Sequence, residues 1–488
     1  MKLLLFFLQC IVITVGMPLE TRAQFSLLKD VYPGPVSGIE PPFFIFKNKM
    51  YFSAADDVYG YELWAYDGIN EPYMAYDLLP GSPTSGSRPA HFAICKDTLY
   101  FSAFVDLTQS STAIRKYDGT NPPVIAPYGA VAWVDQLIGF QDLLFFQGYD
   151  EDHGYELWTY DGVHAPHLLK DINPGAGHSL HYSSTIFNNK LYFIANDGTH
   201  GYELWVYDGV NEPSMVYDIT PDPNAYPSTS ELIIFDDKLY FSASTPDYGN
   251  ELWMYDGIND PLRISDINPG VDDSAPGFLT VYQSKLYFNA RTSGLNNELW
   301  VYNGMDDPAL VKDIYPGNNG SGPNYLTVYH NKLYFTASIP DQWQEVWVYD
   351  GMEDPVQLSS ISPDPAQSAS AIFYRVFNDK LYFLADDNIS GEELWVYDDG
   401  IVTATQQVNE MFSSLSVYPN PSHAAFTIQG KTEGNYHLYD GTGKEVLSVQ
   451  LNTANNYRVT IDHLREGLYT LKGFTTKETV HQKIVVIN

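Results

Sequence analysis

A motif that recurs eight times is the feature that most limits what this 488-residue chain can fold into. Lys-Leu-Tyr-Phe returns with small changes about every 47 residues, from Lys49 to Lys380. Two further motifs, Asp-Ile-x-Pro-Gly and Glu-Leu-Trp-x-Tyr-Asp-Gly, follow the same period and also count eight when degenerate copies are included. A period of this length is typical of a repeat architecture in which each copy forms one supersecondary unit.

Each unit predicts four short strands in an antiparallel meander. In the fourth unit we expect them at residues 185–187, 191–195, 203–207 and 215–219. Asn188 and Asn189 between the first two strands tolerate positive φ and so predict a tight hairpin. Because both faces of the strands carry apolar side chains, each sheet must be covered on both sides by sheets of its own kind. The fold class is therefore all-β, and residues 24–400 are expected to form an eight-bladed β-propeller.

The two ends of the repeat region predict how the ring closes. Residues 25–31 match the fourth strand of a unit but have no unit of their own, while the last unit lacks a fourth strand. We expect residues 25–31 to complete the last blade by strand pairing. Residues 401–408 are the alternative fourth strand, but they lack the Asp-Ile-x-Pro signature.

These motifs resemble the ELWxxDGT-repeat propellers found in secreted bacterial proteins. The resemblance covers residues 25–404 and implies a propeller fold without an agreed chemistry. The second unit departs from the pattern, because Ala113, Ile114 and Arg115 stand where Glu, Leu and Trp belong.

The first 23 residues read as a secretory signal peptide. A lysine and an apolar run over residues 3–16 precede Ala23, whose small side chain suits the position before a cleavage site at Gln24. The run is shorter than the roughly 20 residues that a spanning helix needs. We expect no transmembrane segment in the mature chain, whose only cysteine is Cys95. An exported protein without internal disulfides must be held together by packing.

The charge balance excludes two classes of partner. The chain has 60 acidic residues against 26 Lys and Arg, a net charge of -34. Such a field repels the phosphate backbone of nucleic acid and anionic lipid headgroups. Neither nucleic acid nor a membrane surface is expected to bind.

The last part of the chain has a different pattern. Residues 401–414 are polar and aperiodic, which predicts a linker, and residues 415–488 contain short alternating strands expected to form an immunoglobulin-like sandwich. An ordinary accessory sandwich is one interpretation. A set of motif residues indicates a second interpretation. These residues are Tyr418, Pro419, Asn420, Pro421, Gly467, Tyr469 and Lys483.

In combination and order, these residues resemble the type A C-terminal sorting domain of the type IX secretion system, known from Bacteroidetes. The resemblance spans residues 415–488. It implies that the type IX secretion machinery is a partner, that the chain crosses the outer membrane, and that the product is secreted or attached at the cell surface.

Two acidic positions recur in seven of the eight units: the glutamate that opens the third strand and the aspartate of Asp-Gly. A carboxylate needed for one function would not be needed in every blade. Aspartate before glycine forms turns, and a glutamate at a strand start can accept backbone hydrogen bonds. We therefore expect structural roles for both positions.

Acidic residues in the loops between the second and third strands are the better candidates for a binding rim. They are Asp56, Asp57, Asp150, Asp152 and Asp197. Clustered carboxylates without a nearby lysine suggest a cation such as calcium. None of these loops matches the Asp-x-Asp-x-Asp-Gly calcium pattern, so the absence of any cofactor stays the first expectation and calcium the alternative.

No catalytic residue is predicted. Gly-x-Ser-x-Gly is absent, and the pairs His164/His167 and His178/His181 flank one strand whose ends point to opposite rims, so they cannot form one zinc site. Among 60 acidic residues some pair always has a separation that suits glycoside hydrolysis, so such a pair is no evidence.

Near-equal units favour a scaffold that binds over an enzyme, which would concentrate unusual polar residues in one or two blades. The leading hypothesis is a secreted or surface binding and adhesion propeller whose ligand is a glycan or a protein held by the rim loops. The alternatives are an extracellular hydrolase acting on polysaccharide and a purely structural surface component.

Overall fold

The structure is a computed structural model. It describes residues 24–400 apart from 82–85, 107, 128, 130, 180–182, 221–230, 318, 341, 360 and 363–366. It also describes residues 415–487 apart from 419–421, 424–425, 431–433, 441–443, 453–457, 462–463, 465–466 and 476–478. The chain divides into two compact units, of which Gln24–Asp398 is the larger and the other begins at Asp399. Every regular element in the described residues is a strand, and none of them forms a helix that could cross a membrane.

The larger unit consists of eight four-stranded antiparallel sheets, numbered here as blades in chain order. Blade 1 comprises β2 (Ile39–Phe46), β3 (Lys49–Asp56), β4 (Gly60–Tyr66) and β5 (Tyr73–Tyr76), and blade 2 comprises β6 (Ala90–Cys95), β7 (Thr98–Phe104), β8 (Thr112–Tyr117) and β9 (Val124–Ile125). Blade 3 comprises β10 (Trp133–Phe140), β11 (Leu143–Asp150), β12 (Gly154–Tyr160) and β13 (His167–Lys170), and blade 4 comprises β14 (Ser184–Phe187), β15 (Lys190–Asn196), β16 (Tyr202–Tyr207) and β17 (Ser214–Met215).

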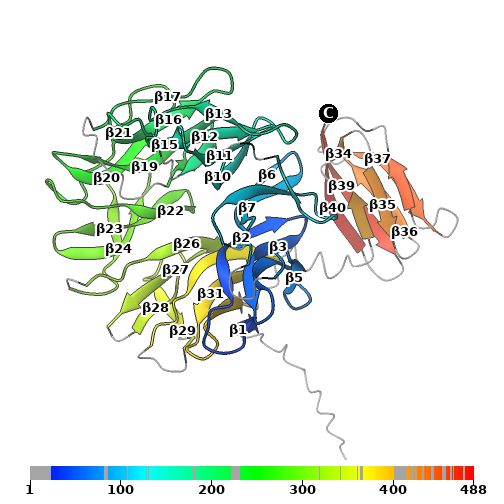
Figure 1. Ribbon diagram of the computed structural model, residues 1–488. Helices are drawn as coiled ribbons and strands as arrows, with labels where there is room; N and C mark the ends of the chain where they lie inside the picture. The colour runs from blue at the N-terminus through cyan, green and yellow to red at the C-terminus, as the bar shows by residue number, and fades with distance from the viewer. Residues whose placement is uncertain are drawn as a thin grey trace, which may run out of the picture. The chain divides into compact units, whose positions relative to one another are not determined.

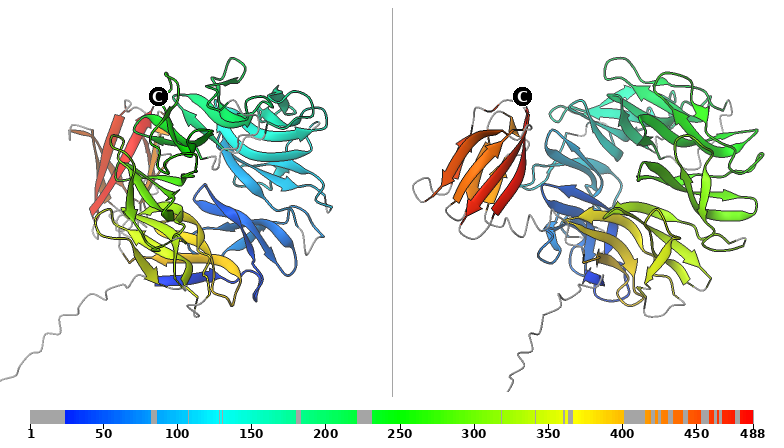
Figure 2. Two further views of the ribbon diagram at one scale, coloured as in Figure 1. Left: turned by 90° about the vertical axis from the view of Figure 1, so that its left-hand side faces the viewer. Right: turned by 180° about the vertical axis from the view of Figure 1, so that it is seen from behind.

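Blade 5 comprises β18 (Ile233–Phe235), β19 (Lys238–Thr245), β20 (Gly249–Tyr255) and β21 (Leu262–Arg263), and blade 6 comprises β22 (Gly277–Tyr282), β23 (Lys285–Thr292), β24 (Leu295–Tyr302) and β25 (Ala309–Lys312). Blade 7 comprises β26 (Asn324–Tyr329), β27 (Lys332–Ile339), β28 (Gln342–Tyr349) and β29 (Val356–Ser359), and blade 8 comprises β30 (Ile372–Phe377), β31 (Lys380–Asp386) and β32 (Glu392–Asp398) together with β1 (Gln24–Lys29). The blades surround a common axis, and the first strand of each blade lies innermost (Figures 1 and 2). This is the eight-bladed propeller that the repeat predicts.

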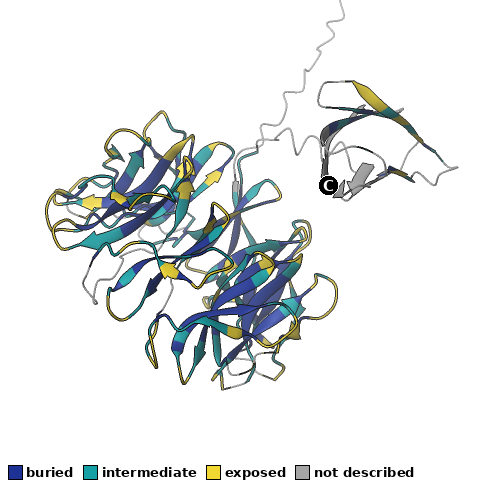
Figure 3. Cartoon of the chain, turned by 90° about the horizontal axis from the view of Figure 1, so that it is seen from above, coloured by how far each residue is buried: buried dark blue, intermediate teal, exposed yellow. Residues whose placement is uncertain are grey.

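The repeated apolar residues form the contacts between blades. In β3, all six residues from Met50 to Ala55 are buried, as expected for a sheet covered on both faces. The tyrosine of Lys-Leu-Tyr-Phe contacts the third-strand tyrosine of the following blade, and the ring centroids of Tyr51 and Tyr117 lie 5.7 Å apart. Buried residues are therefore concentrated in the strands and exposed residues in the loops (Figure 3).

The strand expected at residues 25–31 is β1, and it pairs antiparallel with β32 in blade 8. Phe25 lies opposite Tyr397 and Leu27 opposite Trp395. The first and last strands of the propeller therefore belong to one sheet, which closes the ring. Residues 401–408, the alternative for this position, lie outside the described residues.

The second unit consists of two sheets, as expected for an immunoglobulin-like sandwich. One contains β33 (Leu415–Tyr418), β35 (Phe426–Gly430) and β38 (Arg458–Ile461). The other contains β34 (Ser422–His423), β40 (Thr479–Ile487), β39 (Gly467–Thr475), β36 (Gly434–Tyr439) and β37 (Glu445–Leu451). Its core includes Ile428, Tyr436 and Leu471, all buried.

The sorting-motif residues occupy strand positions where they are described. Tyr418 ends β33, Gly467 begins β39, and Lys483 lies in β40 opposite Thr470. Tyr469 is buried in the core of this unit. Pro419, Asn420 and Pro421 lie outside the described residues, as do the expected linker 401–414 and the signal peptide 1–23 with Ala23; Gln24 begins β1.

Candidate ligand-binding cleft

The repeated glutamates tie the third strand of a blade to the loop that follows its fourth strand. Glu156 is fully buried, and its carboxylate accepts hydrogen bonds from the backbone N–H groups of Ile172 (2.9 Å) and Asn173 (3.0 Å). Glu298 makes the equivalent bonds in blade 6 and also accepts one from the Ser321 hydroxyl at 2.5 Å. Burial raises the pKa of Glu156 to about 7, because the charged form loses its hydration. These glutamates support the fold.

The aspartates of Asp-Gly form turns. The Oδ1 of Asp67 accepts hydrogen bonds from the backbone N–H groups of Ile69 (2.9 Å) and Asn70 (2.8 Å), and these bonds lower the pKa of its carboxyl group. Asn303, the exception in the sequence, uses its side-chain oxygen in the same way. The turn therefore needs a side-chain oxygen and not a charge.

Three of the predicted rim carboxylates serve their own loops. Asp56 accepts hydrogen bonds from the backbone N–H groups of the second and third residues that follow it. Asp150 and Asp197 do the same, and each also contacts a histidine three residues further on, His153 and His200. Among the described residues, no three His, Cys, Asp or Glu side chains lie together so that they could hold a metal ion.

The other two predicted rim residues, Asp57 and Asp152, are exposed in the same loops as Asp56 and Asp150. The predicted rim acids thus belong to separate hairpins in blades 1, 3 and 4. The structure does not bring them together into one cluster.

The histidines have separate local partners. His164 contacts Asp161, with 2.6 Å between Nδ1 and Oδ2, and the Nδ1 of His178 accepts a hydrogen bond from the Tyr155 N–H at 3.1 Å. His167 is exposed in β13, and His181 lies outside the described residues. The expectation that the two pairs do not converge on one zinc site stays a prediction, because His181 is not described.

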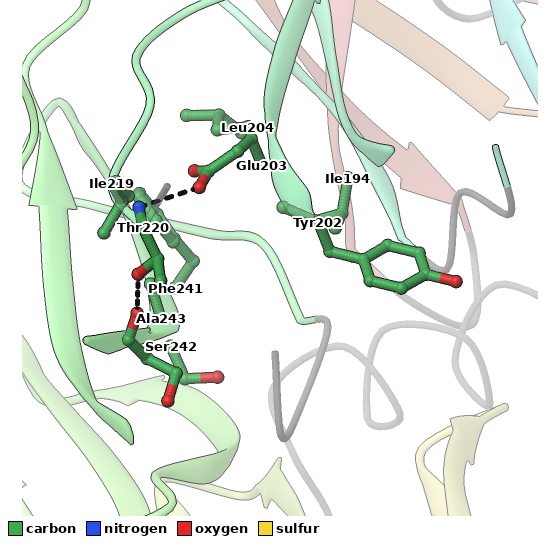
Figure 4. Close-up of a pocket in the computed structure, with 10 residues that line it drawn as sticks. Ile194, Tyr202, Glu203, Leu204, Ile219, Thr220, Phe241, Ser242 and Ala243 are labelled. Carbon is green, nitrogen blue, oxygen red and sulfur yellow. Dashed lines mark hydrogen bonds between the residues drawn. The ribbon is translucent and has the colours of Figure 1, made fainter. Parts of the chain in front are cut away.

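An enclosed cavity of about 10 Å³ lies between blades 4 and 5 (Figure 4). It is lined by Glu203, Thr220 and Ser242 among others, and Thr220 donates its backbone N–H to Glu203 and its hydroxyl to the carbonyl oxygen of Ser244. A space of this size holds one water molecule. It is therefore no ligand site.

Two larger cavities lie in blades 5 to 8, and both fall within the size range of small-molecule sites. The first, which we call the amide cleft, has a volume of about 390 Å³ and is lined by Phe278, Asn289, Asn296, Asn297, Asn319, Gly320, Ser321, Gly322, Asn324, Ser338, Trp343 and Gln344. The second, the aromatic cavity, has a volume of about 350 Å³ and is lined by Glu231, Phe278, Leu279, Thr280, Tyr325, Leu326, Thr327, Phe373 and Tyr374.

Unusual hairpins in blades 6 and 7 build the amide cleft. In blades 1 and 3 the hairpin between the second and third strands ends in an aspartate-capped turn. In blade 6 the strands continue until Thr292 lies opposite Leu295, and in blade 7 until Ile339 lies opposite Gln342. This extension presents Trp343, of which 54% is exposed. An exposed tryptophan is unusual here, because every tryptophan of the Glu-Leu-Trp motif is at least partly buried.

The described part of the amide cleft's lining is uncharged. None of its described lining residues is Asp, Glu, Lys or Arg, although the chain as a whole carries a net charge of -34. Side-chain amides dominate the walls, and an amide can both donate and accept hydrogen bonds. The side-chain oxygens of Asn297 and Asn324 are buried and have no hydrogen-bond partner among the described residues. The described walls thus consist largely of amides, which suit a neutral polar ligand.

The aromatic cavity is built from bulged inner strands. β22, β26 and β30 each shift register near their start, and the bulge residues Phe278, Tyr325 and Phe373 have φ values of 53°, 53° and 56°. The ring centroids of Phe278 and Tyr325 lie 5.2 Å apart, and those of Tyr325 and Phe373 lie 4.7 Å apart. A β-bulge redirects side chains, and here it places three aromatic rings side by side.

The bulge position differs between blades more than the repeat motifs do. It lies two residues before the residue paired with the second-strand aromatic in the six blades whose first strand shifts register, and blades 4 and 5 have the equivalent position without a shift. From blade 1 to blade 8 this position is occupied by Pro42, His91, Gln136, Ser183, Glu231, Phe278, Tyr325 and Phe373. Blades 2 to 5 contribute polar residues, whereas blades 6 to 8 contribute aromatic rings. Sequence analysis missed this site because it followed what the units share; aligning the units and asking where they differ is the signal that could have found it.

The class of protein follows from the two units together. Residues 416–487 match the family described as the secretion system C-terminal sorting domain. The chain is thus a β-propeller followed by a sorting domain of the type IX secretion system. The sorting domain indicates secretion or attachment at the outer surface and implies the secretion machinery as a partner.

Solved structures similar to this chain include other propellers. PorZ, described as an essential bacterial surface component of the type IX secretion system of Porphyromonas gingivalis, is 13% identical with a TM-score of 0.42; the match covers 91% of this chain and 69% of that chain. The Dos1 propeller is 14% identical with a TM-score of 0.45, over 75% of this chain and 94% of that chain. At these identities the likeness transfers no function. A comparison with curated proteins found no match.

Proposed function

We propose that this protein is a secreted or surface-displayed binding propeller that holds a neutral glycan in the amide cleft. The observation that carries the proposal is the exposed ring of Trp343 beside walls of uncharged amides. The resemblance of the repeat to ELWxxDGT propellers of secreted bacterial proteins supports the same setting.

The chemistry of a sugar ring suits this lining. One face of the ring presents C–H groups that pack against an aromatic side chain, and the edge presents hydroxyls that donate and accept hydrogen bonds. The lining of the amide cleft includes the amide side chains of Asn289, Asn296 and Gln344, and an amide carries both donors and an acceptor. An anionic glycan would meet the negative field of the protein, so a neutral one is favoured.

Hydrolysis is the second function to consider, and the cleft offers little support for it. Glycoside hydrolysis normally uses two carboxyl groups on either side of the scissile bond. The described lining of the amide cleft contains no carboxyl group, and that of the aromatic cavity contains one, Glu231. The lining therefore favours binding.

Trp343→Ala in the mature chain, residues 24–488, tests the proposal. We expect binding to neutral glycans on an array, followed by calorimetric titration, to weaken about tenfold or more when the stacking ring is lost. The matched control is Tyr59→Ala, because Tyr59 is 41% exposed in the equivalent hairpin of blade 1 but lies outside the cleft. Equal binding by both variants and the parent would contradict the cleft as the site, and a parent that binds no glycan would favour a purely structural role.

A further inference from the structure

The amide cleft and the aromatic cavity adjoin each other. Phe278 lines both, and the neighbouring residues Asn324 and Tyr325 of β26 line one each. A ligand that leaves the amide cleft along β26 therefore meets the aromatic rings next.

We propose that the two cavities are consecutive subsites for a linear neutral oligosaccharide. One sugar packs against Trp343, and a following sugar packs against Tyr325, the middle ring of the three in the aromatic cavity. This inference rests on the proposed function and adds the length of the ligand and its path toward the axis of the propeller.

The aromatic cavity has the features that a sugar subsite needs. Its three rings supply apolar surface, and Thr280 and Thr327 supply hydroxyls beside them. The rings of Phe278, Tyr325 and Phe373 contact one another at centroid distances of 5.2 and 4.7 Å, so little ordering is required when a ligand binds. The opposite blades carry His91, Gln136 and Ser183 at the same position and provide no such stack.

Glu231 sets the charge preference of this subsite. It is the one charged side chain in the described lining, and its Oε2 accepts a hydrogen bond from the Leu279 backbone N–H at 2.8 Å. That bond fixes the carboxyl group beside the rings, where it accepts from sugar hydroxyls. Burial raises the pKa of Glu231, so the group repels carboxylates or sulfates at a pH high enough to ionise it. The ligand class is therefore neutral oligosaccharides, and uronates are disfavoured.

The test uses the mature chain and neutral homo-oligosaccharides of glucose, xylose, mannose and N-acetylglucosamine with one to six units. We expect the affinity of the bound series to rise about tenfold or more beyond the first units and then level off. Tyr325→Ala should abolish the rise and leave affinity for the shortest ligand unchanged, whereas Trp343→Ala weakens binding at every length. Tyr325→Phe should restore the rise, because it keeps the ring.

Two further variants complete the design. Gln136→Ala, at the same bulge position in blade 3, should leave the length dependence intact. Glu231→Gln should raise the affinity for the matching uronate-terminated oligosaccharide without changing that for the neutral one, and this readout stays informative if Tyr325→Ala fails to fold. Length-independent binding that still needs Trp343 would overturn the two-subsite proposal alone, whereas no binding at any length would overturn the proposed function with it.

Discussion

At the scale of single residues, the pKa of a carboxyl group is raised inside the blades and lowered in the exposed turns. Burial raises the pKa of Glu203 to about 7 and that of Glu393 to about 8. At the exposed Asp208, hydrogen bonds from Asn211 lower the pKa to about 2. Desolvation dominates inside the blade, and hydrogen bonding to the charged form dominates at the turn.

The buried glutamates predict a stability that falls as the pH rises. Their pKa is higher in the folded protein than in the unfolded chain, so their stabilising contribution is complete below the unfolded pKa near 4.5 and is lost as the pH rises through about 7 to 8. Glu156→Gln should reduce the loss of unfolding free energy between pH 5 and pH 8 by about 1–3 kcal/mol.

Chemical denaturation at the two pH values measures this difference. Glu353→Gln is the control, because Glu353 is exposed on a turn of blade 7 and should not alter the pH dependence. An unchanged pH dependence in Glu156→Gln would show that this glutamate stays charged in the folded state.

At the scale of elements, strand pairing explains both ring closure and the site. β1 supplies an edge strand to blade 8 across the whole length of the propeller sequence, and Phe25 packs against Tyr397 with a centroid distance of 4.8 Å. The inner strands carry the bulges that place the aromatic rings. The pairing of β1 with β32 therefore stabilises the ring, and the bulged inner strands shape the surface near the axis of the propeller.

Removal of β1 should destabilise the propeller strongly. A mature chain that begins at Asp30 leaves β32 as an unpaired edge and exposes the contacts of Phe25 and Leu27, at a cost of at least about 3 kcal/mol in unfolding free energy. Urea denaturation measures the loss. Replacement of residues 401–408 by a Gly-Ser sequence of equal length is the control, and equal losses in the two variants would refute closure by β1.

At the scale of the whole molecule, the chain combines a repeat scaffold with an export signal. The propeller and the sorting domain have separate cores, and the sorting-family match is confined to residues 416–487. The amide cleft, the proposed binding site, lies entirely in the propeller unit. Export and binding should therefore be separable.

Truncation after residue 414 should block export across the outer membrane and leave the propeller folded. Cell fractionation should find the truncated chain in the periplasm, with a melting temperature within a few degrees of the full mature chain, since the two cores unfold separately. Normal amounts of truncated protein in the medium or at the surface would show that the second unit is an accessory sandwich.

The blades, their number and the structural roles of the repeated carboxylates could be predicted from the sequence, because each depends on contacts within one period. A hairpin needs its Asn-Asn turn, and Asp67 needs only the N–H groups two and three residues further on. Asp56 and Asp150 likewise cap their own turns by accepting backbone N–H groups, and their role in a cation or ligand rim stays a prediction.

Only the tertiary structure decided where the amide cleft and the aromatic cavity lie. Phe278, Tyr325 and Phe373 are separated by 47 and 48 positions in the sequence and meet because three inner strands converge on one axis and each bulges at the same point. Trp343 is exposed near the tip of a hairpin whose strands pair as far as Ile339 and Gln342. The sequence predicted ring closure, but neither the bulges nor the extent of pairing in a hairpin leaves a signal in the recurring motifs, since both depend on how the strands pack in the folded blades.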